Sequence, residues 1–285
     1  MFIHKSADLL HIELQKQRSQ GNKIGFVPTM GALHAGHRSL LERARAENDT
    51  VVCSIFVNPT QFDDKADLDK YPSTIDSDME MLRSVNVDYL YYPEVEDVYP
   101  NGEASDDIDL AGLDLIHEGA LRSGHFQGVA QVVKRFFEIV QPTSAYFGQK
   151  DFQQTAVIGQ LIKLCEFDTK MVVCPIVREP HGLAMSSRNE RLSPVERDKA
   201  SFIYKSLLKL KERCFFKPLS EALTTTIKYL KSIEDASLEY LICVDGDTLQ
   251  EVNDLYDSDY VVALTVVKYG GVRLLDNIIL KKPKV

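Results

Sequence analysis

Short apolar runs alternate with amphipathic stretches through about the first two-thirds of the chain, and this alternation limits the folds it can adopt. The apolar runs predict buried strands at Ile24–Val27, Val51–Val57, Tyr89–Tyr92, Ala145–Phe147 and Met171–Val173. Apolar side chains at helical spacing predict helices near Gly36–Asn48, Thr74–Val85, Val129–Val140 and Phe152–Cys165. Strands that alternate with helices favour an α/β fold with a doubly wound parallel sheet, which binds ligands at the carboxyl ends of its strands.

The pattern changes after about Arg188. Two helices are expected at Pro194–Glu212 and Leu219–Lys231, followed by three β-rich runs at Leu238–Val244, Tyr260–Val267 and Val272–Leu280. Lys268–Gly271 reads as the turn between the last two runs. We therefore expect a large first domain over residues 1–184 and a small α+β second domain over residues 185–285.

Charge and composition restrict the partners. The chain of 285 residues has 33 Lys and Arg against 42 Asp and Glu, a formal charge of −9. An acidic balance argues against nucleic acid as a partner, although a few local cations can still bind a small anion. No apolar run approaches the roughly 20 residues that span a bilayer, and Met1–Lys16 lacks the apolar core of a signal peptide. We expect a cytoplasmic protein without a membrane partner, with its five cysteines as reduced thiols.

The segment Phe26–His37 is the most informative for chemistry. An apolar strand runs into a glycine-containing turn, and a helix is expected to begin near Gly36. A helix N-terminus offers backbone N–H groups and a positive dipole end, which suit phosphate. His34 and His37 are three residues apart, so both can lie on one side of the first helical turn and donate to phosphate oxygens. A capped turn with surface histidines and a metal site are the alternatives.

Three further segments follow predicted strands or lie near the expected domain boundary. Asn58–Phe62 carries amides that can hold a hydroxyl and a carboxylate, although taken alone this segment is better explained as a proline turn that closes a strand. In Phe147–Gln154, Lys150 can reach a phosphate, and an N-capped helix is the alternative. Leu183–Asn189 places two hydroxyls beside Arg188 as an anion clamp, or forms a hydrophilic linker.

Taken together and in order, these segments resemble the pantothenate synthetases, the pantoate–β-alanine ligases of the nucleotidyltransferase superfamily. The resemblance is carried by Lys23–His37, Asn58–Phe62, Gly124–Val129, Tyr146–Asp151, Pro175–Glu179 and Gly182–Asn189. The His-x-Gly-His element is shared across the superfamily, and the other blocks single out the ligase. The resemblance implies a Rossmann-like catalytic domain, which would bind ATP and pantoate, and a small C-terminal lid domain.

The family joins (R)-pantoate to β-alanine with ATP and Mg²⁺, through pantoyl adenylate, and releases AMP and pyrophosphate. The resemblance also implies a homodimer. The residues that it implies as ATP contacts are Met30, Gly31, Ala32, Leu33, His34, Ala35, Gly36, His37, Gly148, Gln149, Lys150, Asp151, Val177, Met185, Ser186, Ser187 and Arg188. Among these, it gives a catalytic role to His34, His37, Lys150 and Arg188. It implies substrate contacts for Asn58, Gln61 and Gln154. It names no metal ligand beyond the ATP phosphates.

The sequence departs from the family pattern at Ser73, Ser123 and His181, where Arg, Pro and a small or acidic residue are more familiar. These departures concern loop contacts more than the type of reaction. Three other functions remain open from the residues: a nucleotidyltransferase acting on a phosphate ester, a class I tRNA synthetase relative, and a nucleotide-binding regulator without catalysis. The two glutamine-bearing blocks disfavour the first, the acidic chain disfavours the second, and Lys150, His37 and Arg188 disfavour the third.

Overall fold

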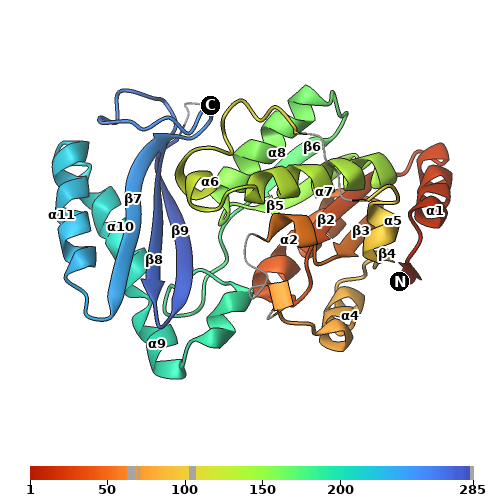
Figure 1. Ribbon diagram of the computed structural model, residues 1–285, viewed down its shortest axis with the longest axis horizontal. Coiled ribbons are helices and arrows are strands. Elements are labelled where there is room, and N and C mark those ends of the chain that lie inside the picture. The colour runs from red at the N-terminus through yellow and green to blue at the C-terminus, as the bar shows by residue number, and fades with distance from the viewer. Residues whose placement is uncertain (63–67, 70, 103–106, 283–285) are drawn as a thin grey trace. The chain divides into compact units, whose positions relative to one another are not determined.

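The computed structural model describes residues 1–62, 68–69, 71–102 and 107–282. By its internal contacts the chain divides into two units (Figure 1). Unit 1 comprises Met1–Gln149 and Gln153–Pro175, and unit 2 comprises Lys150–Phe152 and Ile176–Val285. Residues 176–184 therefore group with the second unit, and the functional boundary expected at 184/185 stays a prediction.

Unit 1 contains a six-stranded sheet in the order β1-β4-β3-β2-β5-β6, and all of its pairings are parallel. The strands are β1 (Phe2–His4), β2 (Ile24–Thr29), β3 (Thr50–Ile55), β4 (Tyr89–Tyr91), β5 (Ser144–Gly148) and β6 (Lys170–Cys174). The prediction of a doubly wound parallel sheet is confirmed. Chain order reverses between β2 and β5, so the carboxyl ends of these strands flank the switch point at which such sheets bind ligands.

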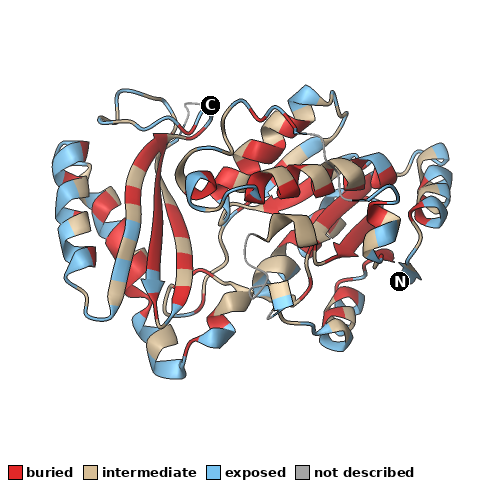
Figure 2. Ribbon diagram, in the orientation of Figure 1, coloured by how far each residue is buried: buried red, intermediate tan, exposed pale blue. Residues whose placement is uncertain are grey.

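Helices cover both faces of this sheet, and for this reason its strands read as continuous apolar runs (Figure 2). Strand residues such as Phe26 pack with α1 (Ala7–Ser19), α7 (His125–Val140) and α8 (Phe152–Leu164) on one face. The neighbouring residue Val27 points to the other face, where α2 (Ala35–Glu47) and α4 (Ile75–Ser84) cover it. The shorter helices of the unit are η1 (Pro59–Gln61), α5 (Val95–Val98) and α6 (His117–Leu121).

Unit 2 packs helices against a three-stranded antiparallel sheet, in the order β7-β8-β9. Its strands are β7 (Ala236–Asp245), β8 (Val261–Tyr269) and β9 (Val272–Lys281). Gly270 and Gly271 both have positive φ, 54° and 72°, which is the conformation that a two-residue hairpin turn requires. Its helices are η2 (Ser187–Arg191), α9 (Pro194–Lys199), α10 (Phe202–Arg213) and α11 (Leu219–Lys231).

Two expectations about the elements are corrected. The single helix expected over Pro194–Glu212 is two helices, because α9 ends at Lys199 and α10 begins at Phe202. A capping box between Ser193 and Glu196 fixes the start of α9. The short edge strand β1 and helix α1 were not assigned from the sequence. Among the helices of the described residues, none has the length and apolar character needed to cross a bilayer.

Candidate active site

The turn after β2 requires a glycine. Gly31 has φ +83°, and a Cβ at this position would lie 3.1 Å from Ile55 Cγ2 and 3.2 Å from Asp78 Oδ2. The backbone conformation would strain any other residue, and a Cβ would make tight contacts with both neighbours. Ala32 follows with φ +48°, so two successive residues are left-handed and turn the chain sharply towards α2.

Asp78, from the first turn of α4, holds this turn in place. Its buried carboxylate accepts hydrogen bonds from the N–H groups of Ala32 (2.9 Å) and Leu33 (2.8 Å), and from the Thr74 hydroxyl (3.1 Å). Backbone N–H groups at such a turn bind anions, and here the protein supplies its own. A phosphate must therefore use other donors. Asp78 was missed from the sequence because an acid in the first turn of a helix is ordinary.

His34 and His37 are brought together at the start of α2. His34 is the N-cap, and its Nδ1 accepts from Gly36 N at 3.1 Å, while His37 Nδ1 accepts from His34 N at 3.3 Å. The two ring centroids lie 4.1 Å apart. A backbone N–H can only donate, so each neutral ring carries its proton on Nε2. The capping bonds thus fix both tautomers and leave Nε2–H as the donor of each ring.

Gln61 lies on η1, which packs closely against α7. A Cβ on Gly128 would meet Thr60 O at 2.5 Å and Gln61 Cα at 2.7 Å, so only glycine allows this approach. Asn58 Nδ2 donates to Gly128 O at 3.0 Å, and His125 Nδ1–H donates to Gln61 O at 2.7 Å. His125 and Gly128 lie in a block that carried the family resemblance, but no sequence pattern indicates that they position Gln61.

The structure places Gln61 beside the glycine turn. Gln61 Nε2 lies 3.0 Å from Met30 Sδ, and Asn58 Nδ2 lies 3.3 Å from Gln61 Oε1. Predicted substrate contacts and predicted ATP contacts therefore meet in unit 1. We call Met30–His37 together with Asn58–Gln61 the glycine-turn region.

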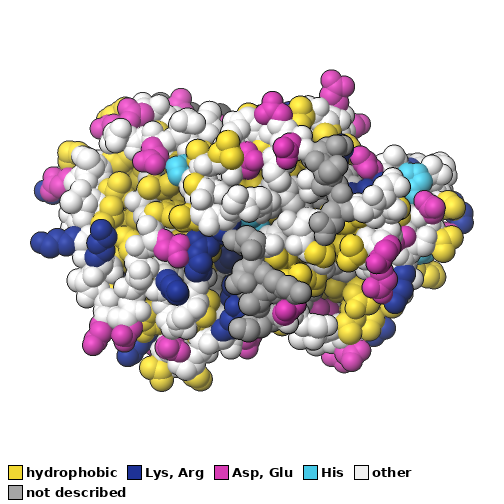
Figure 3. Space-filling model, viewed as in Figure 1, with side chains coloured by type: hydrophobic (Ala, Val, Ile, Leu, Met, Phe, Trp, Pro, Cys, Tyr) yellow, Lys and Arg dark blue, Asp and Glu magenta, His cyan; other side chains and the backbone are white. Residues whose placement is uncertain are grey.

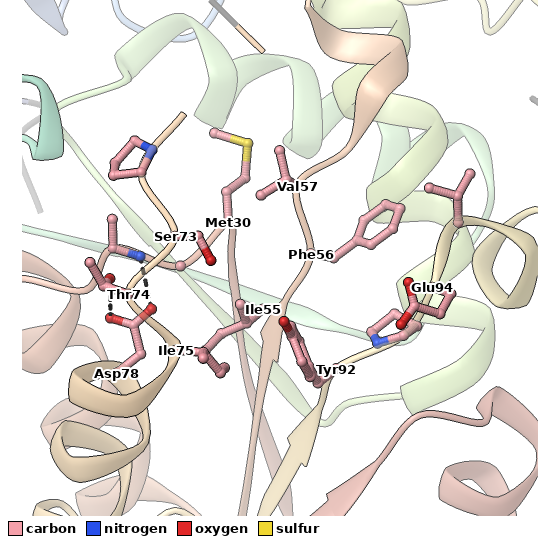
Figure 4. Close-up of a pocket in the computed structure, with 15 residues that line it drawn as sticks. Met30, Ile55, Phe56, Val57, Ser73, Thr74, Ile75, Asp78, Tyr92 and Glu94 are labelled. Carbon is pink, nitrogen blue, oxygen red and sulfur yellow. Dashed lines mark hydrogen bonds between the residues drawn. The ribbon is translucent and has the colours of Figure 1, made fainter. Parts of the chain in front are cut away.

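A cavity of about 200 Å³ borders the glycine-turn region at the carboxyl ends of β2, β3 and β4 (Figure 4). Its lining combines apolar side chains with a few polar ones, and comprises Met30, Gly31, Ala32, Ile55, Phe56, Val57, Pro72, Ser73, Thr74, Ile75, Asp78, Tyr92, Pro93, Glu94 and Val95. Ser73, one of the departures from the family pattern, is part of this lining, so that departure changes a cavity wall.

The end of β5 carries the next predicted contacts. Gln149 N donates to Cys174 O at 2.8 Å, which extends the β5–β6 pairing past Gly148. On α8, Gln153 is buried and its amide binds the carbonyls of Leu113 and Ile116, so this glutamine is structural. The adjacent Gln154, the predicted substrate contact, is only partly buried in the same unit.

The remaining predicted contacts belong to unit 2 and form what we call the cation region: Lys150, Asp151, Val177 and Met185–Arg188. The Lys150 side chain is 19% exposed, and its Nζ lies 3.4 Å from Asp151 Oδ1. Met185 N donates to Val177 O at 3.0 Å, which places these two predicted nucleotide contacts side by side. Ser186 caps η2 by accepting from Arg188 N at 3.3 Å.

Glu179 fixes the backbone of Leu183–Asn189, the predicted anion clamp. The single Nε–H of Arg197 is shared by both oxygens of the buried Glu179 carboxylate, at 2.9 and 2.7 Å, and Asn189 Nδ2 donates to one of them at 2.8 Å. Asn189 Nδ2 also donates to Ala184 O at 3.0 Å. Burial would raise the pKa of Glu179, but the bonds from Arg197 and Asn189 outweigh it and hold the pKa below its usual value. His181, a departure position, lies 3.7 Å from Glu179 through its Nε2.

The described residues do not build a dedicated metal cage, since no group of three or more His, Cys, Asp or Glu side chains gathers among them. Mg²⁺ is commonly held through substrate phosphates, waters and only one or two carboxylates. A magnesium ion that arrives with ATP would need no such group of side chains.

The chain resembles known proteins along nearly its whole length. The family model for pantoate-beta-alanine ligase matches residues 2–279. Pantothenate synthetase of Phocaeicola vulgatus is 50% identical over 270 residues, 94% of this chain and 95% of that protein. The enzyme of Bacteroides fragilis is 47% identical over 276 residues, 97% of each chain.

Two solved structures resemble the chain. The crystal structure of pantothenate synthetase from Thermus thermophilus has a TM-score of 0.91 at 39% identity, and the match covers 99% of this chain and 100% of that one. Pantoate-beta-alanine ligase from Francisella tularensis, complexed with beta-gamma ATP and beta-alanine, has a TM-score of 0.78 at 36% identity, with 98% of each chain covered.

Proposed function

Because the chain belongs to the pantoate-beta-alanine ligase family, we propose that it joins pantoate to β-alanine with ATP and releases AMP and pyrophosphate. The family match along nearly the whole chain carries this proposal. The Francisella relative, complexed with beta-gamma ATP and beta-alanine, supports these two substrates. No observation favours the three alternative functions, which are a phosphate-ester nucleotidyltransferase, a tRNA synthetase relative and a non-catalytic regulator.

The glycine-turn region supplies neutral donors. We assign the Nε2–H groups of His34 and His37 to phosphate oxygens of ATP, because their Nδ1 atoms are committed to backbone N–H groups. We assign Gln61, Asn58 and Gln154 to pantoate, since amides both donate to a carboxylate and accept from a hydroxyl. The carboxylate of pantoate is itself the nucleophile, so no serine or cysteine nucleophile is required.

The cation region supplies charge. Asp and Glu side chains are spread over the face shown in Figure 3, in keeping with the net charge of −9. Local cations must therefore attract the anionic substrates. We assign Lys150 to the α-phosphate, and Ser186, Ser187 and Arg188 to the departing pyrophosphate, where positive charge and hydroxyl donors stabilise the transition state. Mg²⁺ would neutralise ATP phosphate charge when bound.

The reaction is proposed to pass through pantoyl adenylate. A carboxylate is a poor acyl donor, so one of its oxygens first attacks the α-phosphorus and the bond to pyrophosphate breaks. The amine of β-alanine then attacks the acyl carbon, and AMP leaves with the former carboxylate oxygen. The amine loses a proton as the amide forms. Orientation of the two anions by fixed donors accounts for much of the rate.

Isotope labelling tests this order. With oxygen-18 in the pantoate carboxylate, one labelled oxygen is expected in AMP. Pantoate alone is expected to support exchange of labelled pyrophosphate into ATP without β-alanine. Label that stays wholly in the amide product, or ADP as the nucleotide product, would contradict the adenylate pathway.

The quaternary state and location are also proposals. The family resemblance favours a homodimer, and light scattering at micromolar concentration is expected to give twice the chain mass of 32.2 kDa. A monomer under those conditions would remove this proposal. The cytoplasmic location expected from the sequence stays a prediction.

A further inference from the structure

The segment that carries Lys150 is attached to unit 2 by two contacts. Asn277 Nδ2, on β9, donates to the main-chain carbonyl of Lys150 at 3.0 Å. The ring of Phe152 meets that of Tyr260 edge-on, with centroids 6.2 Å apart and planes at 70°. Lys150–Phe152 accordingly group with unit 2, although Gln149 and Gln153 on either side group with unit 1.

Asn277 is itself held by a buried ion pair. Asp276 and Asn277 are consecutive in β9, so their side chains point to opposite faces of the strand. Asp276 is 4% exposed and binds Arg178 through both oxygens, at 2.8 and 2.7 Å, while its Oδ1 also accepts from Asn277 N at 2.7 Å. The Arg178 guanidinium stacks 3.5 Å from the ring centroid of Tyr204. This bidentate, stacked pair fixes the backbone from which the Asn277 amide projects.

The side chain of Lys150 is held less firmly than its backbone carbonyl. Its Nζ is 3.4 Å from Asp151 Oδ1, beyond the usual range for a hydrogen bond, and the Asp151 side chain is 49% exposed. A pair at this distance with one half-exposed partner contributes little. The carbonyl bond from Asn277 is shorter and joins more buried groups, so it is the stronger restraint on where residue 150 lies.

We propose that Asn277, fixed by the Arg178–Asp276 pair, is a positioning residue that sets the place of the Lys150 ammonium group. The proposal rests on the proposed function, in which Lys150 acts on the α-phosphate. Because Asn277 acts through the backbone of Lys150, its loss is expected to lower kcat for adenylation and to leave the KM for pantoate nearly unchanged.

The test compares Asn277→Leu with a matched control, Thr265→Val. Thr265 is buried on β8 and donates to Tyr240 O at 2.9 Å, so the control also removes a part-buried bond from a side chain to a carbonyl. Pantoate-dependent exchange of pyrophosphate into ATP is measured for both variants, alongside thermal unfolding. We expect Asn277→Leu to lose tenfold or more in kcat, and Thr265→Val to stay within twofold of the unaltered protein. Equal losses in the two variants would overturn the proposal.

A double-mutant cycle separates positioning from general destabilisation. In a Lys150→Ala background, with single-turnover detection of the residual rate, adding Asn277→Leu is expected to change the rate by less than twofold. A further tenfold loss would show that Asn277 acts independently of Lys150 and would overturn the proposal. If Asn277→Leu does not unfold cooperatively, Asn277→Ser, which is smaller and cannot span the same bond, is tested against the same expectations.

The single variants separate the role of Lys150 from that of Asn277. Full activity in Lys150→Ala would remove the role given to Lys150 in the proposed function, and the positioning proposal with it. A large loss in Lys150→Ala together with unchanged kcat in Asn277→Leu would leave the proposed function intact and overturn the positioning role alone.

Discussion

The glycine-turn region and the cation region are held in place by different means. In the first, side-chain acceptors collect backbone N–H groups: Asp78 binds two in the turn, and His34 and His37 bind two at the start of α2. In the second, side-chain ion pairs with a buried carboxylate carry the framework: Arg178 pairs with Asp276, 98 positions away, and Arg197 with Glu179.

The difference shows what kind of precision each region needs. Backbone N–H groups and imidazole rings are set by local chain geometry, so a turn and a cap suffice to fix them. Long cationic side chains have many rotamers, and a fixed framework limits them only through contacts that reach across the unit. Removing a hydrogen-bond partner in the glycine-turn region should therefore lower the stability of the turn. Removing an ion-pair partner in the cation region should displace its positive charge.

The largest effect is expected at the cation itself. Lys150→Ala should lower the rate of pantoate-dependent pyrophosphate exchange by about 10²–10³-fold, about 3–4 kcal/mol, because a charge contact to the transition-state phosphate is lost. Lys163→Ala removes an exposed lysine from α8, the helix that follows Lys150, and serves as the matched control. Near-normal exchange by a folded Lys150→Ala protein would identify Lys150 as an ordinary surface charge.

The next effect tests whether the glycine turn depends on its internal anion. Asp78→Asn presents an amide N–H to a backbone donor and removes the charge, so we expect a loss of about 3 kcal/mol in the free energy of unfolding. Urea denaturation measures it, and Asp76→Asn, exposed in the same helical turn, is the control. If both variants lie within 0.5 kcal/mol, roughly the scatter of neutral surface changes, the turn is held by other contacts.

The two regions also differ in how well the sequence predicts their structure. The strands of unit 1 are buried on both faces, so their apolar runs locate them, and glycine, histidine and amide motifs at their ends mark the turn. The break between α9 and α10 was missed because Ala200 and Ser201 interrupt no apolar periodicity. Asp276 and Asn277 were missed because nothing in a strand of mixed polarity reveals which backbone carbonyl an amide reaches.

A smaller effect tests the substrate side of the glycine-turn region. Gln61→Ala should weaken pantoate binding by about 30-fold, about 2 kcal/mol, because partners of the amide are left unpaired, while ATP affinity stays unchanged. Isothermal titration calorimetry with each ligand measures both, and Gln15→Ala, exposed on α1, is the control. A loss of ATP affinity in place of pantoate affinity would move Gln61 out of the acid pocket.

The smallest effect concerns the second ion pair of unit 2, between Glu179 and Arg197. The pKa of Glu179 is held below its usual value, so its stabilising contribution is complete above the unfolded pKa of about 4.3 and is lost as pH falls through the folded pKa. Glu179→Gln cannot titrate, and above about pH 5 it should be less stable by a constant amount of about 1 kcal/mol, a modest value because Arg197 is 35% exposed. This gap should narrow as the pH falls below about 4, because the unaltered protein alone loses its charged pair.

Urea unfolding from pH 3 to pH 8 measures the gap. The control is Glu190→Gln, which should show almost no gap, because the Glu190 side chain pairs with the same arginine but is 77% exposed. A gap that stays constant down to pH 3 would mean that the loss of stability in Glu179→Gln does not come from the carboxylate charge.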